Sequence, residues 1–166
     1  MLTFDYFRQE SIRKFLADSR RTGRPKAIVI DGCIMLYDLL VIGLATRIGS
    51  TPDKVRKKHG RLKPLAREAL TDEYIPLRDV IFAIADARNA AAHETITDAD
   101  FEAKFVSVWS MVSGGAAWPE SVVVRSSYCR AFFSLLAFDL GRWQVSLSPS
   151  GYFSGVQVVD WDRFSR

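Results

Sequence analysis

Residues 77–94 read LRDVIFAIADARNAAAHE, and this stretch decides the fold of the chain. Apolar residues recur at i, i+3 and i+4 spacing along one helical face: Leu77, Val80, Ile81, Ile84, Ala87, Ala91 and Ala92. The pattern predicts an amphipathic helix that begins near Leu77 and closes at His93. On a helical wheel Arg88 falls within the apolar face, whereas Asp86, Asn89 and His93 lie on the polar side.

An arginine within an apolar face needs a partner, because the guanidinium keeps its charge and is costly to bury alone. Asp31 and Asp38 are the candidate counter-ions, since they lie seven residues apart on one face of an otherwise apolar segment. In this purely structural interpretation Arg88 pairs with one of them and locks the core. His93 then caps the helix C-terminus, where a cation is favoured.

The rest of the chain predicts an all-α, compact bundle of about five main helices in a single domain, 1–166. Helical spacing and Gly or Pro punctuation place the main helices at about 4–21, 27–48, 77–93, 97–112 and 128–143. The bundle covers about 1–143. The start of the last helix is open, because Val122–Val124 favour a strand. In the tail, 144–166, the apolar runs 145–147 and 156–159 flank Pro149-Ser150-Gly151 and suggest a small hairpin.

Residues 27–48 are apolar nearly all round and are close in length to a membrane span. Two carboxylates, Asp31 and Asp38, would be expensive in lipid, so we expect the central buried helix of a bundle. A membrane span is the alternative for the whole segment. A short strand is the alternative for 27–32, where β-branched residues are dense.

Composition and charge favour a cytoplasmic protein with an anionic partner. Cys33 and Cys129 are far apart and lack CxxC spacing, and the N-terminus lacks the pattern of a signal peptide, which fits a reducing cytoplasm. The net charge is +4, but residues 1–70 alone carry 15 Lys and Arg against 7 Asp and Glu. Such asymmetry suggests RNA or an acidic protein surface as a partner, without choosing between them.

The densest basic run follows a predicted helix start, where Thr51 is the expected N-cap and Pro52 the first helical residue. Its candidate RNA contacts are Lys54, Arg56, Lys57, Lys58, His59, Arg61 and Lys63. Phosphate contacts of this kind give affinity without sequence choice. The alternative is a solvated connector, and no aromatic residue interleaves to signal base stacking.

The spacing Arg88-Asn89-x3-His93 resembles the R-x(4–6)-H signature of the HEPN superfamily, in which Asn often follows the Arg. The resemblance implies a small helical bundle and a metal-independent endoribonuclease of the toxin or defence type, with Arg88, Asn89 and His93 as catalytic residues. It also implies a homodimer that builds one active site from two motifs, and an antitoxin or regulatory protein as a further partner. Position 95 is Thr95, so the tyrosine that some antitoxins modify two residues past the histidine is missing here.

The chemistry of RNA cleavage fits these residue types. Attack by the 2′-hydroxyl needs a base, an acid for the leaving 5′-oxygen, and positive charge on the phosphoryl oxygens. Histidine suits the proton transfers because its ordinary pKa is about 6.5, and arginine suits the phosphate. One chain supplies a single motif histidine, whereas a two-fold dimer supplies two. On a continuous helix Arg88 and His93 lie roughly 140° apart, so the helix must end or bend there, or different protomers must supply them.

Other chemistries lack a pattern in the sequence. His93-Glu94 begins like HExxH, but position 97 is Thr97, and there is no Walker loop, GxGxxG or GxSxG. With only His59 and His93 in the chain we expect no metal and no cofactor. The alternative to catalysis is a non-catalytic HEPN-like module that binds RNA or protein, or only dimerises.

Overall fold

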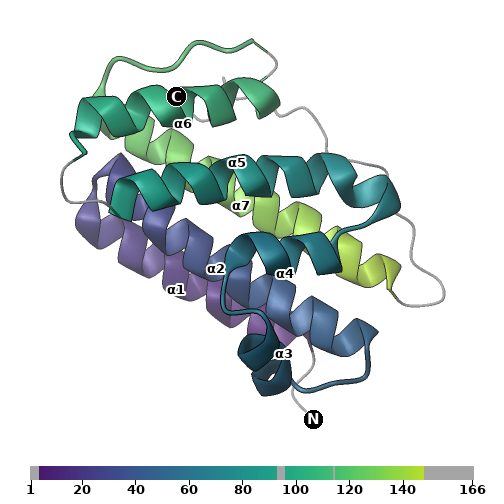
Figure 1. Ribbon diagram of the computed structural model, residues 1–166. Coiled ribbons are helices and arrows are strands. Elements are labelled where there is room, and N and C mark those ends of the chain that lie inside the picture. Colours follow the sequence, from purple (N-terminus) through teal and green to yellow (C-terminus); the bar gives the residue numbers. More distant parts are fainter. Residues whose placement is uncertain (1–3, 93–95, 114, 148–166) are drawn as a thin grey trace.

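A computed structural model describes residues 4–92, 96–113 and 115–147, and this part of the chain is an all-α bundle of seven helices without strands (Figure 1). The helices are α1 (Phe4–Thr22), α2 (Pro25–Arg47), α3 (Pro52–Lys58), α4 (Leu62–Ala69), α5 (Ile75–Ala92), α6 (Asp98–Val112) and α7 (Val122–Ser146), with a 3-10 turn at Asp72–Tyr74. Five are long, and α3 and α4 are short. The predicted fold class and its five main helices are therefore confirmed.

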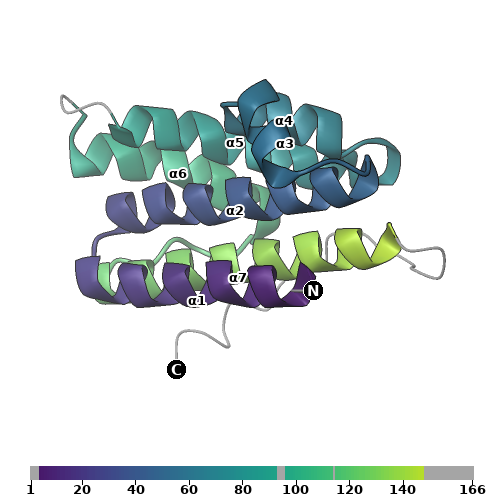
Figure 2. The ribbon, with the colours of Figure 1, turned by 90° about the horizontal axis from the view of Figure 1, so that it is seen from below.

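Helix α2 is the centre of the bundle. Figure 2 shows it between a layer formed by α1 and α7 and a second layer that contains α4, α5 and α6. More than half of its residues are buried, including Ile28, Leu36 and Leu40. The prediction of a central buried helix is confirmed, and the strand alternative for 27–32 is wrong because the tertiary packing of this helix outweighs β propensity. By length and composition α2 would also fit a membrane span, and 61% of that apolar window is buried inside the bundle.

Two glycines let α7 approach α2 closely. A Cβ atom at Gly32 would overlap the ring of Phe133, and a Cβ atom at Gly43 would overlap the ring of Trp143. Both aromatic side chains are fully buried. Gln144 adds a polar contact, because its Nε2 donates to the carbonyl oxygen of Leu39 at 2.9 Å. The glycines that interrupt the apolar run are thus contact points between helices.

Helix α7 begins and ends differently from the prediction. It begins at Val122, so the strand preference of 122–124 is overridden once the following residues bury a helical face that includes Cys129 and Phe132. It continues to Ser146, so the first arm of the expected hairpin, 145–147, is not a strand. The second arm lies outside the described residues.

Side chains from α2 hold the α3–α4 segment in place. The hydroxyl of Tyr37 donates to the carbonyl oxygen of His59 at 2.7 Å. The guanidinium of Arg47 donates to the carbonyl oxygens of Glu68 and Ala69, which are free of helical partners at the end of α4. At the start of α3 the side chain of Thr51 accepts from the backbone N–H of Lys54, which confirms the predicted N-cap. These contacts fix the loop between α3 and α4 against α2.

Candidate functional site

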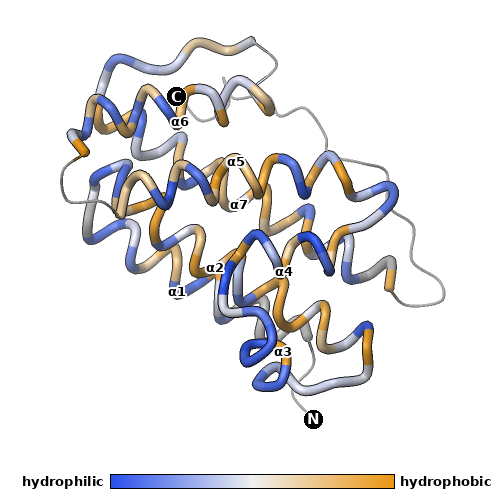
Figure 3. The backbone as a smooth tube through the Cα atoms, viewed as in Figure 1, coloured by the Kyte–Doolittle hydropathy of each residue, from blue (hydrophilic) through white to orange (hydrophobic). Residues whose placement is uncertain are grey.

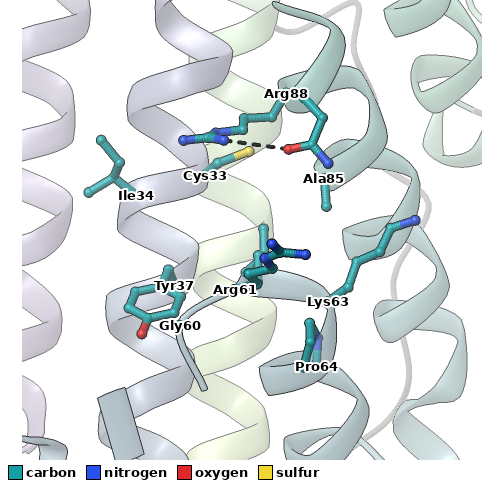
Figure 4. A pocket seen from close by; sticks show the side chains of 11 residues that line it. Cys33, Ile34, Tyr37, Gly60, Arg61, Lys63, Pro64, Ala85 and Arg88 are labelled. Carbon is teal, nitrogen blue, oxygen red and sulfur yellow. Dashed lines mark hydrogen bonds between the residues drawn. The ribbon is translucent and has the colours of Figure 1, made fainter. Parts of the chain in front are cut away.

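A cavity of about 650 Å³ lies between α2, the α3–α4 segment and α5 (Figure 4). Three parts of the chain line it: Cys33, Ile34 and Tyr37 from α2; Gly60, Arg61, Leu62, Lys63 and Pro64 from the loop and α4; and Ala85, Arg88 and Asn89 from α5. Two residues of the motif and two of the basic run therefore meet at one cavity, although 20 or more positions separate them in sequence.

Two residues of the motif, Arg88 and Asn89, lie on the last two turns of α5. The apolar face of that helix is buried as expected at Ile84, Ala87 and Ala91. Arg88 is exposed, however, and its Nη1 donates to Oδ1 of Asn89 at 3.4 Å. The expectation that Arg88 is buried in the apolar face is therefore wrong. A helical wheel gives only the direction of the Cα–Cβ bond. The Arg88 side chain is long enough for its guanidinium to reach the cavity although its Cβ lies on the apolar face.

The proposed counter-ions of Arg88 have other surroundings. Asp38 Oδ1 accepts from Nη2 of Arg56 at 2.8 Å, so Asp38 pairs with the basic run rather than with Arg88. Asp31 lies in a groove between α1 and α2, where burial and the charge of Asp18 raise its pKa while Lys14 lowers it. Both residues are partly exposed. The interpretation of Asp38 as the structural counter-ion of Arg88 is wrong.

His93 follows the last residue of α5 but lies outside the described residues. Its predicted role as a proton carrier or as a C-terminal cap stays a prediction. Arg88 lies four residues before Ala92, the last residue of α5. Arg88 and Asn89 thus lie close to the end of α5.

The basic run divides into two groups in the structure. Arg61 and Lys63 line the cavity, and Lys54 and Lys57 are exposed on α3. Three other members contact carboxylates of the bundle, as Lys63 also does: Arg56 contacts Asp38, Lys58 and His59 contact Glu68, and Lys63 contacts Asp86. His59 is only 8% exposed, so it supports the loop rather than facing a ligand in solution. Figure 3 shows the hydrophilic α3 beside the apolar α2.

Several cavity residues have no signal in the sequence that points to a site. Ile34 and Tyr37 belong to an apolar helix, and Leu62, Pro64 and Ala85 resemble ordinary packing residues. Their common position depends on the packing of α2 against α4 and α5. The one sequence signal for them is the spacing of Cys33 and Tyr37, which places both on one face of α2.

Cys33 lines the cavity as a free, buried thiol. Burial raises the pKa of its thiol to about 12, although the charge of Arg88 acts in the opposite direction. The reactive form of cysteine is the thiolate, which is scarce at neutral pH for such a group. Cys33 therefore contributes apolar surface beneath the Arg88 side chain, beside which Figure 4 draws it.

The cavity combines a cationic rim with an apolar floor. Arg61, Lys63 and Arg88 supply the charge, and Lys63 also contacts the carboxylate of Asp86. Asn89 adds an amide that both donates and accepts. Guanidinium and ammonium groups are side chains that bind phosphate oxygens well. In the described part of the chain, no three His, Cys, Asp or Glu side chains are grouped so that they could hold a metal ion.

Comparisons with known proteins add no assignment. No family model matches the chain, and neither the curated proteins nor the solved structures contain a significant match.

Proposed function

We propose that this protein is a metal-independent endoribonuclease of the toxin or defence type that acts on RNA in the cytoplasm. The observation that carries the proposal is the meeting of Arg88 and Asn89 with Arg61 and Lys63 at one cavity. The spacing of the motif and the charge of the basic run are separate signals in the sequence. Neither signal implies that the two converge on one surface, and their convergence supports both.

Each residue has a role in this proposal. Arg88 binds the scissile phosphate and stabilises the charge that grows on its oxygens, which is the main electrostatic demand of the reaction. Asn89 orients Arg88 through the 3.4 Å hydrogen bond. His93 transfers protons, taking one from the 2′-hydroxyl or giving one to the 5′-oxygen. Since one chain has one motif histidine, a homodimer completes the site with the partner's copy.

A second candidate is a non-catalytic module that binds RNA or a regulatory protein. The cationic rim alone favours it, because Arg61, Lys63 and Arg88 can bind phosphate groups without any proton transfer. The two candidates differ in whether RNA ends are produced. A module that binds RNA shares with the nuclease the prediction that the cavity binds RNA, whereas a module that binds only protein does not.

The test compares Arg88→Ala with Arg21→Ala, which removes the same charge from an exposed position at the end of α1. Under the nuclease proposal Arg88→Ala lowers cleavage of single-stranded RNA by about 100-fold or more, while Arg21→Ala cleaves like wild type. Because Arg88 is exposed, its removal should change the unfolding free energy by less than about 0.5 kcal/mol. Equal cleavage by both variants would contradict the role of Arg88.

A further inference from the structure

Three cations surround one aromatic ring beside the cavity. The Nζ atom of Lys63 and the Cζ atoms of Arg67 and Arg78 lie 5.8, 5.6 and 5.7 Å from the ring centroid of Phe82. Lys63 and Arg67 belong to α4, whereas Arg78 and Phe82 belong to α5. The half-buried ring is therefore the centre of a cationic cluster that spans the two helices, here called the Phe82 cluster.

The Phe82 cluster keeps a net positive charge. Asp86 contacts Lys63, and Asp79 Oδ1 lies 3.7 Å from Nε of Arg78. These two carboxylates oppose three cations, and a contact with an aromatic face offsets mutual repulsion by only about 0.5–1 kcal/mol at exposed sites. An added anion would relieve this repulsion, so the cluster favours phosphate.

The Phe82 cluster is continuous with the cavity because the two share Lys63. Arg61 and Arg88 also line the cavity, whereas Arg67 and Arg78 contact the Phe82 ring and are not among the residues that line the cavity. The five cations form a strip across the paired surfaces of α4 and α5. A strip of this kind matches the repeating charge of an RNA backbone better than it matches a single small anion.

The opposite edge of the cavity has the reverse charge. Ile34, 49% exposed, lines both the cavity and a neighbouring groove of about 280 Å³ between α1 and α2. Four carboxylates and one cation, Lys14, line this groove. Glu10 is paired with Arg13 and Asp38 with Arg56, which leaves Asp18 and Asp31 against Lys14. The raised pKa of Asp31, caused by burial and then by Asp18, agrees with a surplus of negative charge there. A phosphate that passed Ile34 would meet repulsion.

We propose that a single strand of RNA leaves the cavity across Lys63 and follows the Phe82 cluster, away from the acidic groove. This inference rests on the proposed function and adds the path of the substrate. Arg67 and Arg78 contact phosphates next to the one held by Arg61 and Arg88. The site thus takes a strand of several nucleotides, and the acidic groove excludes the strand from the α1 side.

The experiment measures binding of a uridine dinucleotide and a uridine decamer to the full chain, with His93→Ala as background so that RNA survives. The double variant Arg67→Gln/Arg78→Gln should bind the dinucleotide like the background protein. The double variant should bind the decamer more weakly than the background protein does. At about 0.1 M salt, each phosphate that loses its guanidinium contact should weaken decamer binding by roughly five-fold. Arg61→Gln should weaken binding of both ligands. Arg21→Gln is the matched control and should change neither.

Asp79→Asn covers the case in which the double variant fails to fold, because it removes an exposed carboxylate beside Arg78. It should tighten decamer binding and leave dinucleotide binding unchanged. The path alone would be overturned if Arg61→Gln weakened decamer binding but the double variant, or Asp79→Asn, bound the decamer with the same affinity as the background protein. The path would also be overturned if Arg21→Gln weakened decamer binding as much as the double variant does. Absence of any RNA binding by the background protein would overturn the proposed function as well.

Discussion

The imidazole Nε2 of His59 lies 2.8 Å from Oε2 of Glu68, which links the end of α3 to α4 beside the cavity. Lys58 contacts the other oxygen of the same carboxylate at 3.0 Å. Gly60 and Arg61 follow His59 directly, so this contact and the Tyr37 hydrogen bond determine where the cationic rim of the cavity begins. Glu68 therefore positions the site without lining it.

Glu68 gives the fold an acid sensitivity. The hydrogen bond from Lys58, followed by the charge of His59, holds the pKa of Glu68 below its ordinary value of 4.5. The unfolded chain then binds the proton more readily, so the stabilisation is present above about pH 4.5 and is lost as the pH falls through the lowered pKa. We expect Glu68→Gln to lose about 1 kcal/mol or less at neutral pH, because the side chain is 34% exposed.

Urea unfolding at neutral pH and near pH 3 measures this effect. The difference in unfolding free energy between wild type and Glu68→Gln should shrink at the lower pH. The same variant should bind RNA more weakly, since the rim of the cavity loses a support. If the difference in unfolding free energy between wild type and Glu68→Gln did not change with pH, the contacts of Glu68 with Lys58 and His59 would not be what stabilises its ionised form.

Asp139 should have the opposite effect on stability. Burial raises the pKa of this carboxyl on α7 to about 6, and Arg142 lowers it only in part. The folded chain therefore binds this proton more readily than the unfolded chain does. The resulting contribution to stability is complete below the ordinary pKa of 3.8 and is lost as the pH rises through about 6. Asp139→Asn should therefore stabilise the protein at pH 7, by about 1–2 kcal/mol once solvent screening is allowed for.

Thermal unfolding of Asp139→Asn as a function of pH provides the measurement. The gain over wild type should be largest above about pH 7 and should vanish near pH 4. Reduced stability at neutral pH would show that the ionised carboxylate has a stabilising partner.

The close approach of α2 and α7 predicts a cost for a single methyl group. Gly43→Ala places a Cβ atom against the ring of Trp143, and the buried surroundings leave little room for adjustment. We expect the unfolding free energy to fall by about 1–3 kcal/mol. Gly60→Ala is the matched control, because nothing lies within 4 Å of its new Cβ atom. A cost no greater than that of the control would contradict the packing of these two helices.

The composite site predicts a dimer of the 18.7 kDa chain. Sedimentation at micromolar concentration should give about twice the mass of one chain, since two motif histidines are needed and each chain has one. A monomer at concentrations where cleavage is observed would remove the shared site and leave catalysis to one chain.

The features predicted correctly from the sequence are those that depend on local interactions. The N-cap at Thr51 needs only a side chain and a backbone N–H three residues away, and it is found. The buried face of α5 follows from helical periodicity. The exposure of Arg88 was missed because a wheel does not show where a long side chain ends.

The cavity and the Phe82 cluster were not predicted because they arise from tertiary contacts. Phe82 lies on α5, and two of its three cations come from α4. The basic run has no aromatic residue of its own in the sequence, yet the fold brings one beside it. Likewise, Asp38 and Arg56 are 18 positions apart, and only the packing of α2 against α3 makes them partners.

The central claim is that Arg88, Asn89 and His93 cleave RNA without a metal, and one cleavage assay tests it most directly. Wild-type protein and the His93→Ala variant are incubated with single-stranded RNA in excess EDTA, and the product ends are identified. We expect the wild-type protein to produce 2′,3′-cyclic phosphate and 5′-hydroxyl ends, because the 2′-oxygen is the nucleophile. We expect His93→Ala to bind RNA without cleaving it. Cleavage that EDTA abolishes, or that His93→Ala performs at the wild-type rate, would contradict the central claim.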